Sequence, residues 1–238
     1  MRSVLLRHID IGLNWAIEYI DASACCAWYE RAITRGGFPR ISLAAHGRPT
    51  LKVTNLTIPE VIILQPVKHG DSRGFFSETF SQKLWAEAGV RGGFVQDNHA
   101  FSAQAGTVRG LHFQIPPFDQ GKLVRVVRGA ILDVAVDIRV GSPTFGQHVS
   151  AEISASNWSQ IWVPPGFAHG LTTLESNTEV LYKVTNYYAP EHDKGLLWND
   201  PALGIDWPVE DVSAHLSERD KKNPTLNELP EYFRYTED

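Results

Sequence analysis

The amino-acid sequence predicts an all-β fold, a sandwich or a barrel, from residue 52 onward. Short runs of β-branched and aromatic residues recur there at intervals of about ten residues, and glycine or proline turns separate them. One of these runs alternates between polar and apolar side chains, as a strand with one apolar face does. Together these observations favour a β-architecture with only short helices at its periphery.

The expected elements follow one another with short connections. Ser81 can cap a short helix that extends to Glu87, and Gly89 ends it. After Pro208 the chain reads as irregular structure with short helix, because further prolines limit helix length. The expected strands cover residues 61–64, 75–80, 94–101, 107–114, 123–127, 130–139, 147–153, 160–163, 170–173 and 179–187.

The clearest hairpin lies at 123–139 and is expected to turn at residues 128–129, Arg-Gly. In its second strand, the odd positions of 133–139 carry Asp, Ala, Asp and Arg, whereas the even positions carry Val, Val and Ile. One face is therefore polar. It would face water in an open sandwich, and it would line a pocket in a jelly-roll barrel.

Residues 1–50 differ in character from the rest, and we expect them to be a separate N-terminal extension before a folded domain at 51–238. They contain no lysine, both cysteines and the only methionine. The stretch 11–33 can form a mildly amphipathic helix; the alternative is an extension that packs loosely or not at all. We hypothesise that residues 1–50 are upstream sequence translated from a misassigned start, with Leu51 marking a non-methionine start codon.

The bulk composition argues against several classes of function. A net charge of −5 disfavours a nucleic-acid partner. No apolar run approaches the roughly 18 residues that a membrane span needs. The only cysteines, Cys25 and Cys26, are neighbours and cannot crosslink a fold of this size. That usage favours a reducing compartment, and we expect the cytoplasm.

Two histidines lie in runs that read as strand or as strand and turn. Strict alternation places His112 on the face opposite Arg109, unless a bulge intervenes. A neutral imidazole accepts a proton near pH 7, although a strand histidine can also be no more than a hydrogen-bonded side chain. His169 follows the turn at 164–166, Pro-Pro-Gly, which holds it in one place. The alternative is a turn histidine that satisfies nearby carbonyls.

Four other side chains are candidates for chemistry or anion binding. Lys122 can stabilise the negative charge of an enolate, or it is a solvated lysine at a strand end. Tyr182 can donate its phenolic proton, or it is a core tyrosine with a bonded hydroxyl. Arg73 and Arg109 can clamp an anion, since guanidinium matches phosphate oxygens, or they are surface charges near turns.

The residues do not by themselves name a substrate. Jelly-roll proteins often hold a metal with a His-x-His pair, but Gly110 and Gln114 stand two positions either side of His112, so we expect no metal. Asp220 lies three residues after Ser217, a spacing that also fits a helix capping box. No phosphate-binding glycine motif and no Gly-x-Ser-x-Gly elbow is present. These patterns predict a β-barrel with a polar interior and candidate acid–base residues, but they do not predict a substrate.

Read together, six segments resemble the dTDP-4-dehydrorhamnose 3,5-epimerase family, in the family's order and over about residues 52–232. The resemblance implies a cupin-type jelly roll, a homodimer, and no metal or organic cofactor. It implies a dTDP-sugar substrate, dTDP-4-dehydro-6-deoxy-glucose, converted in dTDP-rhamnose synthesis. The segments are 71–76 (DSRGFF), 94–99 (FVQDNH), 106–114 (GTVRGLHFQ), 120–125 (QGKLVR), 164–170 (PPGFAHG) and 182–191 (YKVTNYYAPE).

The resemblance also assigns roles to residues. A C4 ketone acidifies the hydrogens on C3 and C5, so a base can remove one and an acid can return a proton to the opposite face. By resemblance His112 is the base, Tyr182 is the acid and Lys122 stabilises the enolate oxygen. Asp220 would orient His112, as a carboxylate commonly does for a catalytic imidazole.

A further set of residues would bind the substrate. Arg73 and Glu78 would come from the partner subunit through strand exchange. Asp193 stands where the family commonly has glutamate, and Arg219 where it commonly has lysine; both keep the charge but alter reach. The full set is Arg73, Glu78, Gln96, Asn98, Arg109, Lys122, His169, Tyr188, Asp193 and Arg219.

Three other functions stay open from the sequence. A single-site epimerase or a ketoisomerase on a related dTDP-deoxysugar would differ in the pocket shape beside Tyr182. A non-catalytic sugar-binding cupin would not need His112, Lys122 and Tyr182 as a set. A metal-dependent cupin dioxygenase is disfavoured by Gly110.

Overall fold

The computed structural model describes residues 5–11, 14–20, 51–210 and 213–237. The chain divides into two units, Met1–Arg48 and Pro49–Asp238. In the first unit, β1 (Leu5–Ile11) pairs with β2 (Asn14–Ile20) as an antiparallel ribbon. The helix that was one of two alternatives for 11–33 is therefore excluded at residue 11 and at residues 14–20, and residues 12–13 and 21–33 lie outside the described part of the chain.

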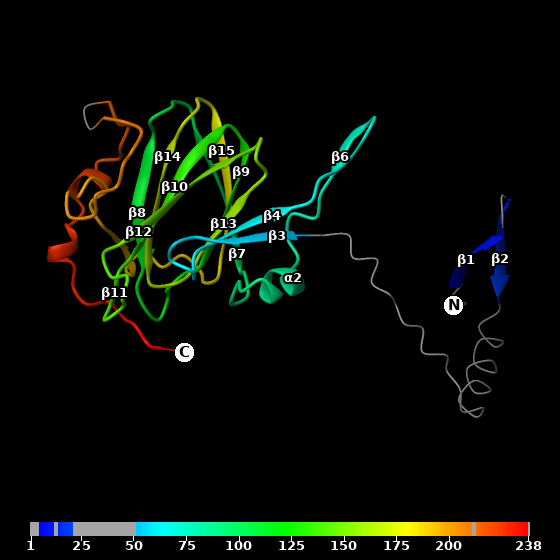
Figure 1. Cartoon of the computed structure of the whole chain (residues 1–238), viewed down its shortest axis with the longest axis horizontal. Coiled ribbons are helices and arrows are strands. Elements are labelled where there is room, and N and C mark those ends of the chain that lie inside the picture. Colours follow the sequence, from blue (N-terminus) through cyan, green and yellow to red (C-terminus); the bar gives the residue numbers. More distant parts are fainter. Residues whose placement is uncertain (1–4, 12–13, 21–50, 211–212, 238) are drawn as a thin grey trace. The chain divides into compact units, whose positions relative to one another are not determined.

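The second unit is built from two antiparallel sheets that pack face to face (Figure 1). One sheet has five strands in the order β12-β10-β14-β8-β16, and the other has six in the order β3-β4-β13-β9-β15-β7. The predicted all-β, cupin-type jelly roll is confirmed. The five strands in chain order are β8 (Val108–Gln114), β10 (Ala130–Asp137), β12 (His148–Ser154), β14 (Phe167–Thr173) and β16 (Asp193–Gly195). The six are β3 (Leu51–Asn55), β4 (Ile62–Pro66), β7 (Gln96–Ser102), β9 (Lys122–Arg128), β13 (Gln160–Val163) and β15 (Thr178–Val184).

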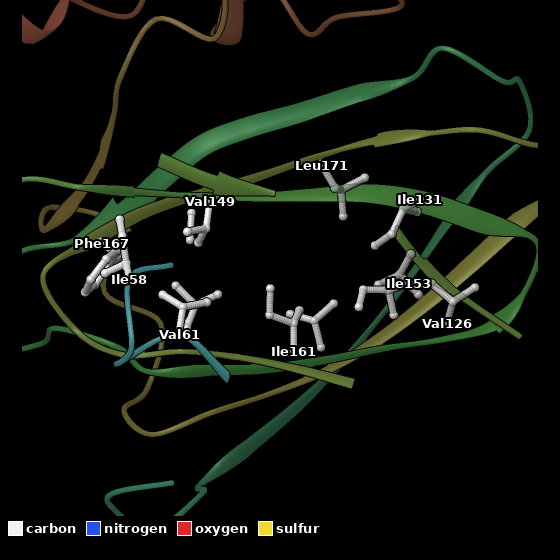
Figure 2. Packing of buried hydrophobic residues seen from close by; sticks show 13 residues of the cluster. Ile58, Val61, Val126, Ile131, Val149, Ile153, Ile161, Phe167 and Leu171 are labelled. Atoms are coloured by element: carbon white, nitrogen blue, oxygen red, sulfur yellow. The ribbon is translucent and has the colours of Figure 1, made fainter. Parts of the chain in front are cut away.

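The main core fills the space between the two sheets. Figure 2 shows Val149, Leu171 and Ile131 facing Val61 and Ile161 across this gap. These side chains are all less than a tenth exposed. Burial of β-branched and leucine side chains stabilises such a core by about 1.5–3 kcal/mol for each residue. The alternation of the strands puts every second residue into this gap and so decides which side chains line it.

The outer faces of both sheets are covered in part. The C-terminal segment packs on the five-stranded sheet, where Leu196 and Leu203 contact the layer that contains Val134 and Val136. On the six-stranded sheet the helix α2 (Gln82–Glu87) buries Trp85 near Trp162. The helix begins after Ser81, as predicted. None of the described helices is long and apolar enough to cross a membrane.

The predicted hairpin at 123–139 is wrong. β9 pairs with β13 and β15, whereas β10 pairs with β12 and β14, so the turn at 128–129 carries the chain from one sheet to the other. Gly129 has a φ of +76°, and a Cβ there would lie 2.3 Å from Oγ1 of Thr178. The turn therefore needs glycine for packing. The predicted alternation in β10 is confirmed, since Ala135 faces the inter-sheet core and Val134 faces the C-terminal segment.

Two smaller pairings complete the second unit. The hairpin β5 (His69–Asp71) and β6 (Gly74–Phe76) projects from the barrel (Figure 1). The parallel pair β11 (Arg139–Val140) and β17 (Phe233–Arg234) ties the end of the chain to the barrel. Between β16 and β17 the chain forms the 3₁₀ turns η1 (Asp220–Lys222) and η2 (Leu226–Glu228). This segment brings Asp220 next to β8.

Candidate active site

A cavity of about 330 Å³ opens between the two sheets. Strands β7, β9 and β15 of one sheet and β8 and β14 of the other supply its walls, and the C-terminal segment closes one side. The structure brings all four predicted catalytic residues together here. The lining residues are Ala100, Arg109, His112, Lys122, Val124, His169, Leu171, Val180, Tyr182, Ser217, Arg219 and Asp220.

A bulge in β8 places Arg109 and His112 on the same side of the strand. The register of β8 against β14 shifts between the pair His112 with His169 and the pair Arg109 with Leu171. Gly110 lies at this shift with a φ of +123°, and a Cβ there would lie 2.6 Å from Cα of Gly170. Strict alternation separates these two side chains. The bulge that the sequence left open instead turns both toward the cavity.

His112 is held by Asp220 from the C-terminal segment. Its Nε2 lies 2.6 Å from Oδ1 of Asp220, whose side chain is 5% exposed. Burial raises the pKa of Asp220, but hydrogen bonding to His112, Ser217 and the backbone of Gly110 and the charge of His112 together outweigh it, so the pKa lies below its ordinary value. The carboxylate therefore stays ionised and can stabilise an imidazolium at His112. The backbone N–H of Asp220 also donates to Ser217 Oγ at 3.1 Å, so the predicted capping interaction is present in part.

The second histidine of the cavity has its own buried carboxylate. Nε2 of His169 lies 2.9 Å from both carboxylate oxygens of Asp133, which is fully buried. Asp133 comes from the polar face of β10. The sequence showed that face but not its partner, which lies in the adjacent strand β14. His169 itself is in β14 rather than in the turn that precedes it.

Lys122 lies at the start of β9, beside His112. Its Nζ donates to the backbone carbonyl of His112 at 3.2 Å. Burial lowers the pKa of Lys122 from 10.5 to about 8, although the charges of Asp193 and Asp133 oppose this shift. The side chain is thus cationic at neutral pH, and a buried cation interacts strongly with negative charge that develops next to it.

Tyr182 lies across the cavity from His112. It belongs to β15 of the six-stranded sheet, whereas His112 belongs to β8 of the five-stranded sheet. Burial raises the pKa of Tyr182, and the charge of Asp193 adds to this while that of Arg109 opposes it. The phenol therefore keeps its proton at neutral pH. A base and an acid on opposite walls of one cavity can exchange protons on opposite faces of a molecule between them.

The predicted substrate-binding residues Gln96, Asn98, Tyr188, Asp193 and Arg219 are joined in one hydrogen-bonded run. Of these, Arg219 lines the cavity, whereas Asn98 lines a second cavity of about 400 Å³. Nε2 of Gln96 donates to Oδ1 of Asn98 at 2.8 Å, and the backbone N–H of Tyr188 donates to Oε1 of Gln96 at 3.2 Å. Oδ2 of Asp193 accepts hydrogen bonds from Tyr188 Oη and from Arg219 Nη1.

Arg109 lies in the wall of this cavity. It donates to the hydroxyl of Ser102 at 3.2 Å and to the carbonyl of Phe101 at 3.0 Å. These bonds hold its guanidinium in place.

Arg73 and Glu78 also lie outside the lining of the first cavity. Arg73 is at the exposed β5–β6 hairpin, 88% exposed, and donates to Asp71. Glu78 and Asn98 line the second cavity of about 400 Å³ together with Arg125 and His99, and Tyr182 lines both cavities. His99 contacts Glu179 and does not join His112 and His169. Among the described residues, no group of three His, Cys, Asp or Glu side chains is arranged to hold a metal ion.

Comparisons with known proteins agree with this geometry. The model of the dTDP-4-dehydrorhamnose 3,5-epimerase family matches residues 55–228. A relative of that name from Sinorhizobium fredii is 56% identical over 181 residues, which cover 76% of this chain and 92% of the relative. A Legionella pneumophila 3,5-epimerase solved with dTDP-4-keto-L-rhamnose matches with a TM-score of 0.75 and 44% identity, over 79% of this chain and all of that one. A 3'-monoepimerase from Streptomyces bikiniensis solved with dTDP-quinovose matches at 0.68 and 35%, over 73% and 87%. The chain is therefore a member of the dTDP-4-dehydrorhamnose 3,5-epimerase family, and its class of chemistry is epimerisation.

Proposed function

We propose that the protein inverts C3 and C5 of dTDP-4-dehydro-6-deoxy-D-glucose and so makes dTDP-4-dehydro-L-rhamnose. The observation that carries this proposal is the placement of His112, backed by Asp220, and Tyr182 on opposite walls of one cavity. The name of the family and the ligand in the Legionella structure supply the substrate class.

Each inversion removes one proton from a carbon and returns one proton to the same carbon. The substrate is neither oxidised nor reduced. His112 removes the proton on the carbon next to the C4 ketone, and the C–H bonding pair becomes the double bond of an enolate. The charge moves to the C4 oxygen, where Lys122 stabilises it. Tyr182 then returns a proton to the other face of the same carbon, and solvent restores both side chains. The chemistry needs no metal or organic cofactor, and turnover should survive dialysis against a chelator.

Proton NMR of the substrate in deuterated water tests the reaction. Loss of both the C3 and the C5 proton signals is the expected result, and addition of a reductase with its reduced nicotinamide cofactor should convert the product to dTDP-L-rhamnose. His112→Ala should lose the exchange at both carbons while it still binds dTDP, since Arg109 and Arg219 in the cavity wall are unchanged. Normal turnover in His112→Ala would refute the base assignment.

A second candidate is a single-site epimerase. The similarity to the Streptomyces 3'-monoepimerase, at 35% identity, favours it as the alternative. The same NMR experiment separates the two functions, because a single-site enzyme removes only one of the two proton signals. Absence of any exchange in folded protein that binds dTDP would instead indicate a binding module.

We also propose a homodimer in which Arg73 and Glu78 complete the partner's site. The exposed position of the β5–β6 hairpin supports this, since Phe75 and Phe76 are 56% and 71% exposed. Mixed dimers of Arg73→Ala and His112→Ala chains test it. If Arg73 acts on the partner's site, each mixed dimer regains one intact site and activity returns. If Arg73 acts within its own chain, mixing two inactive variants restores nothing.

We place the protein in the cytoplasm. Its two cysteines, Cys25 and Cys26, are neighbours and leave the domain at 51–238 without a disulfide. Cell fractionation with an antibody to the native protein would test this.

A further inference from the structure

The carboxylate of Asp193 connects Tyr188 and Arg219, which are distant in the sequence. Its Oδ2 accepts a hydrogen bond from Arg219 Nη1 at 2.6 Å and another from Tyr188 Oη at 3.2 Å. Asp193 begins β16, which is paired with β8 so that Asp193 lies opposite Gln114 and Gly195 opposite His112. The sheet that carries the base therefore also fixes the backbone of this carboxylate.

The side chain of Asp193 is less accessible than that of Arg219. Arg219 is one of the side chains that line the cavity, and Asp193 is not among the described residues that do so. The side chain of Asp193 is 13% exposed, compared with 47% for Arg219. A molecule in the cavity would thus meet the guanidinium, and the carboxylate would hold that guanidinium.

The contact between Asp193 and Arg219 is linked to the pair of Asp220 and His112 through the backbone. Arg219 is the residue before Asp220, at the start of η1, and Asp220 holds His112 at 2.6 Å. The contact between Asp193 and Tyr188 links the carboxylate to Gln96, because the backbone N–H of Tyr188 donates to Gln96 Oε1. The hydrogen-bonded run therefore ends at Arg219, the residue next to Asp220, whose carboxylate orients the base.

We propose that Asp193 is a positioning residue, which holds Arg219 and the Asp220 segment against the cavity and does not bind the nucleotide itself. The proposal rests on the epimerase function proposed above. It gives Asp193 an indirect role in place of the direct contact that the family resemblance implied. Asp193 is shorter than the glutamate, and Arg219 longer than the lysine, that the family commonly has at these positions. The longer guanidinium side chain makes up for the shorter reach of the carboxylate, so the two can still pair.

The charge of Asp193 also acts on the cavity. Burial lowers the pKa of Lys122, and Asp193 is the largest influence that raises it, followed by Asp133. The other ionisable groups that share the cavity with Lys122 are His112, His169, Tyr182, Arg109, Arg219 and Asp220. Loss of the charge at Asp193 should therefore let Lys122 lose its proton at a lower pH than about 8.

The pH profile of kcat/KM is the first test. The wild-type profile should fall above about pH 8, where Lys122 becomes neutral. Asp193→Asn, which removes the charge but keeps the size, should move this alkaline limb to lower pH by roughly half a unit or more. Asp193→Glu restores the charge and should restore the limb. Glu191→Gln, which neutralises an exposed carboxylate in the turn before β16, should leave the limb unchanged. An unmoved limb in Asp193→Asn overturns the proposal.

A double-mutant cycle is the second test, with dTDP affinity measured by calorimetry. Asp193→Asn and Arg219→Gln should each weaken binding by roughly tenfold. If Asp193 acts through Arg219, the double variant should bind about as well as Arg219→Gln alone. Losses that multiply would show a direct contact and overturn the proposal. A wild type that binds dTDP but does not exchange its substrate would refute the epimerase function, which this cycle does not need.

Discussion

Replacing Lys122 by methionine should stabilise the protein while it disables the reaction. Burial holds the pKa of Lys122 at about 8 instead of 10.5. One pKa unit corresponds to about 1.4 kcal/mol, so keeping this lysine charged in the folded protein at neutral pH costs roughly 3 kcal/mol. The variant loses the hydrogen bond to the His112 carbonyl, worth about 1 kcal/mol. We expect a net gain of about 2 kcal/mol, or about 4–8 °C in Tm.

The sign of the pH dependence makes this prediction specific. The cost is full below about pH 8 and shrinks as the pH rises from 8 toward 10.5, because the folded lysine is then neutral while the unfolded one is still charged. Urea unfolding at fixed protein concentration, at about pH 7 and at about pH 9.5, should show the advantage of Lys122→Met falling from about 2 kcal/mol to near zero.

A control variant and a measurement of kcat complete this experiment. Lys52→Met, at an exposed position in β3, is the control and should show no such pH dependence. The kcat of Lys122→Met should drop by roughly 10²–10³-fold, as when other groups that stabilise an oxyanion are removed. A variant that is less stable than the wild type by the same amount at both pH values would refute the reasoning, because the lysine would then stabilise the fold through packing alone.

Three other changes give further predictions. Tyr182→Phe removes the acid and keeps the ring, so product formation should fall further than deuterium exchange by NMR; equal losses would contradict the assignment. Gly110→Ala should lower stability by about 3 kcal/mol in urea unfolding, because its Cβ would lie 2.6 Å from Cα of Gly170 at a φ of +123°; wild-type stability would disprove the need for glycine in the bulge. Deletion of residues 1–48 should leave kcat unchanged, since every residue of the site belongs to Pro49–Asp238; a large loss would give the first unit a role in catalysis.

The sequence predicted strands better than it predicted their partners. Period-two alternation in β10 correctly separated the face of Ala135 from the face of Val134. The turn at 128–129 has the composition of a hairpin, but a turn signal does not say whether the next strand returns to the same sheet or crosses to the other. Here β10 pairs with β12 and β14 of the other sheet, and such pairings between residues far apart in the sequence are not visible at the turn itself.

The site shows the same division between local and distant information. The side chains of His112, Lys122 and Tyr182 could be selected by residue type and by resemblance, and the structure brings them to one cavity. The pairing of His169 with Asp133 could not be found in that way, since it depends on the register of β14 against β10. In the first unit, residues 14–20 form strand where weak helical periodicity suggested a helix, because a poor amphipathic pattern supports either element.

The origin of Asp220 in the C-terminal segment has a consequence for biosynthesis. The ribosome joins the residues of both sheets, His112, Lys122 and Tyr182 included, before it adds Asp220, whose carboxylate orients the base. The pairing of β17 with β11, which ties that segment down, follows later still. Among the described residues that line the cavity, the carboxylate that orients the base is therefore the last to be synthesised. Proteolytic loss of the segment from Asp220 onward would remove that carboxylate from the finished site.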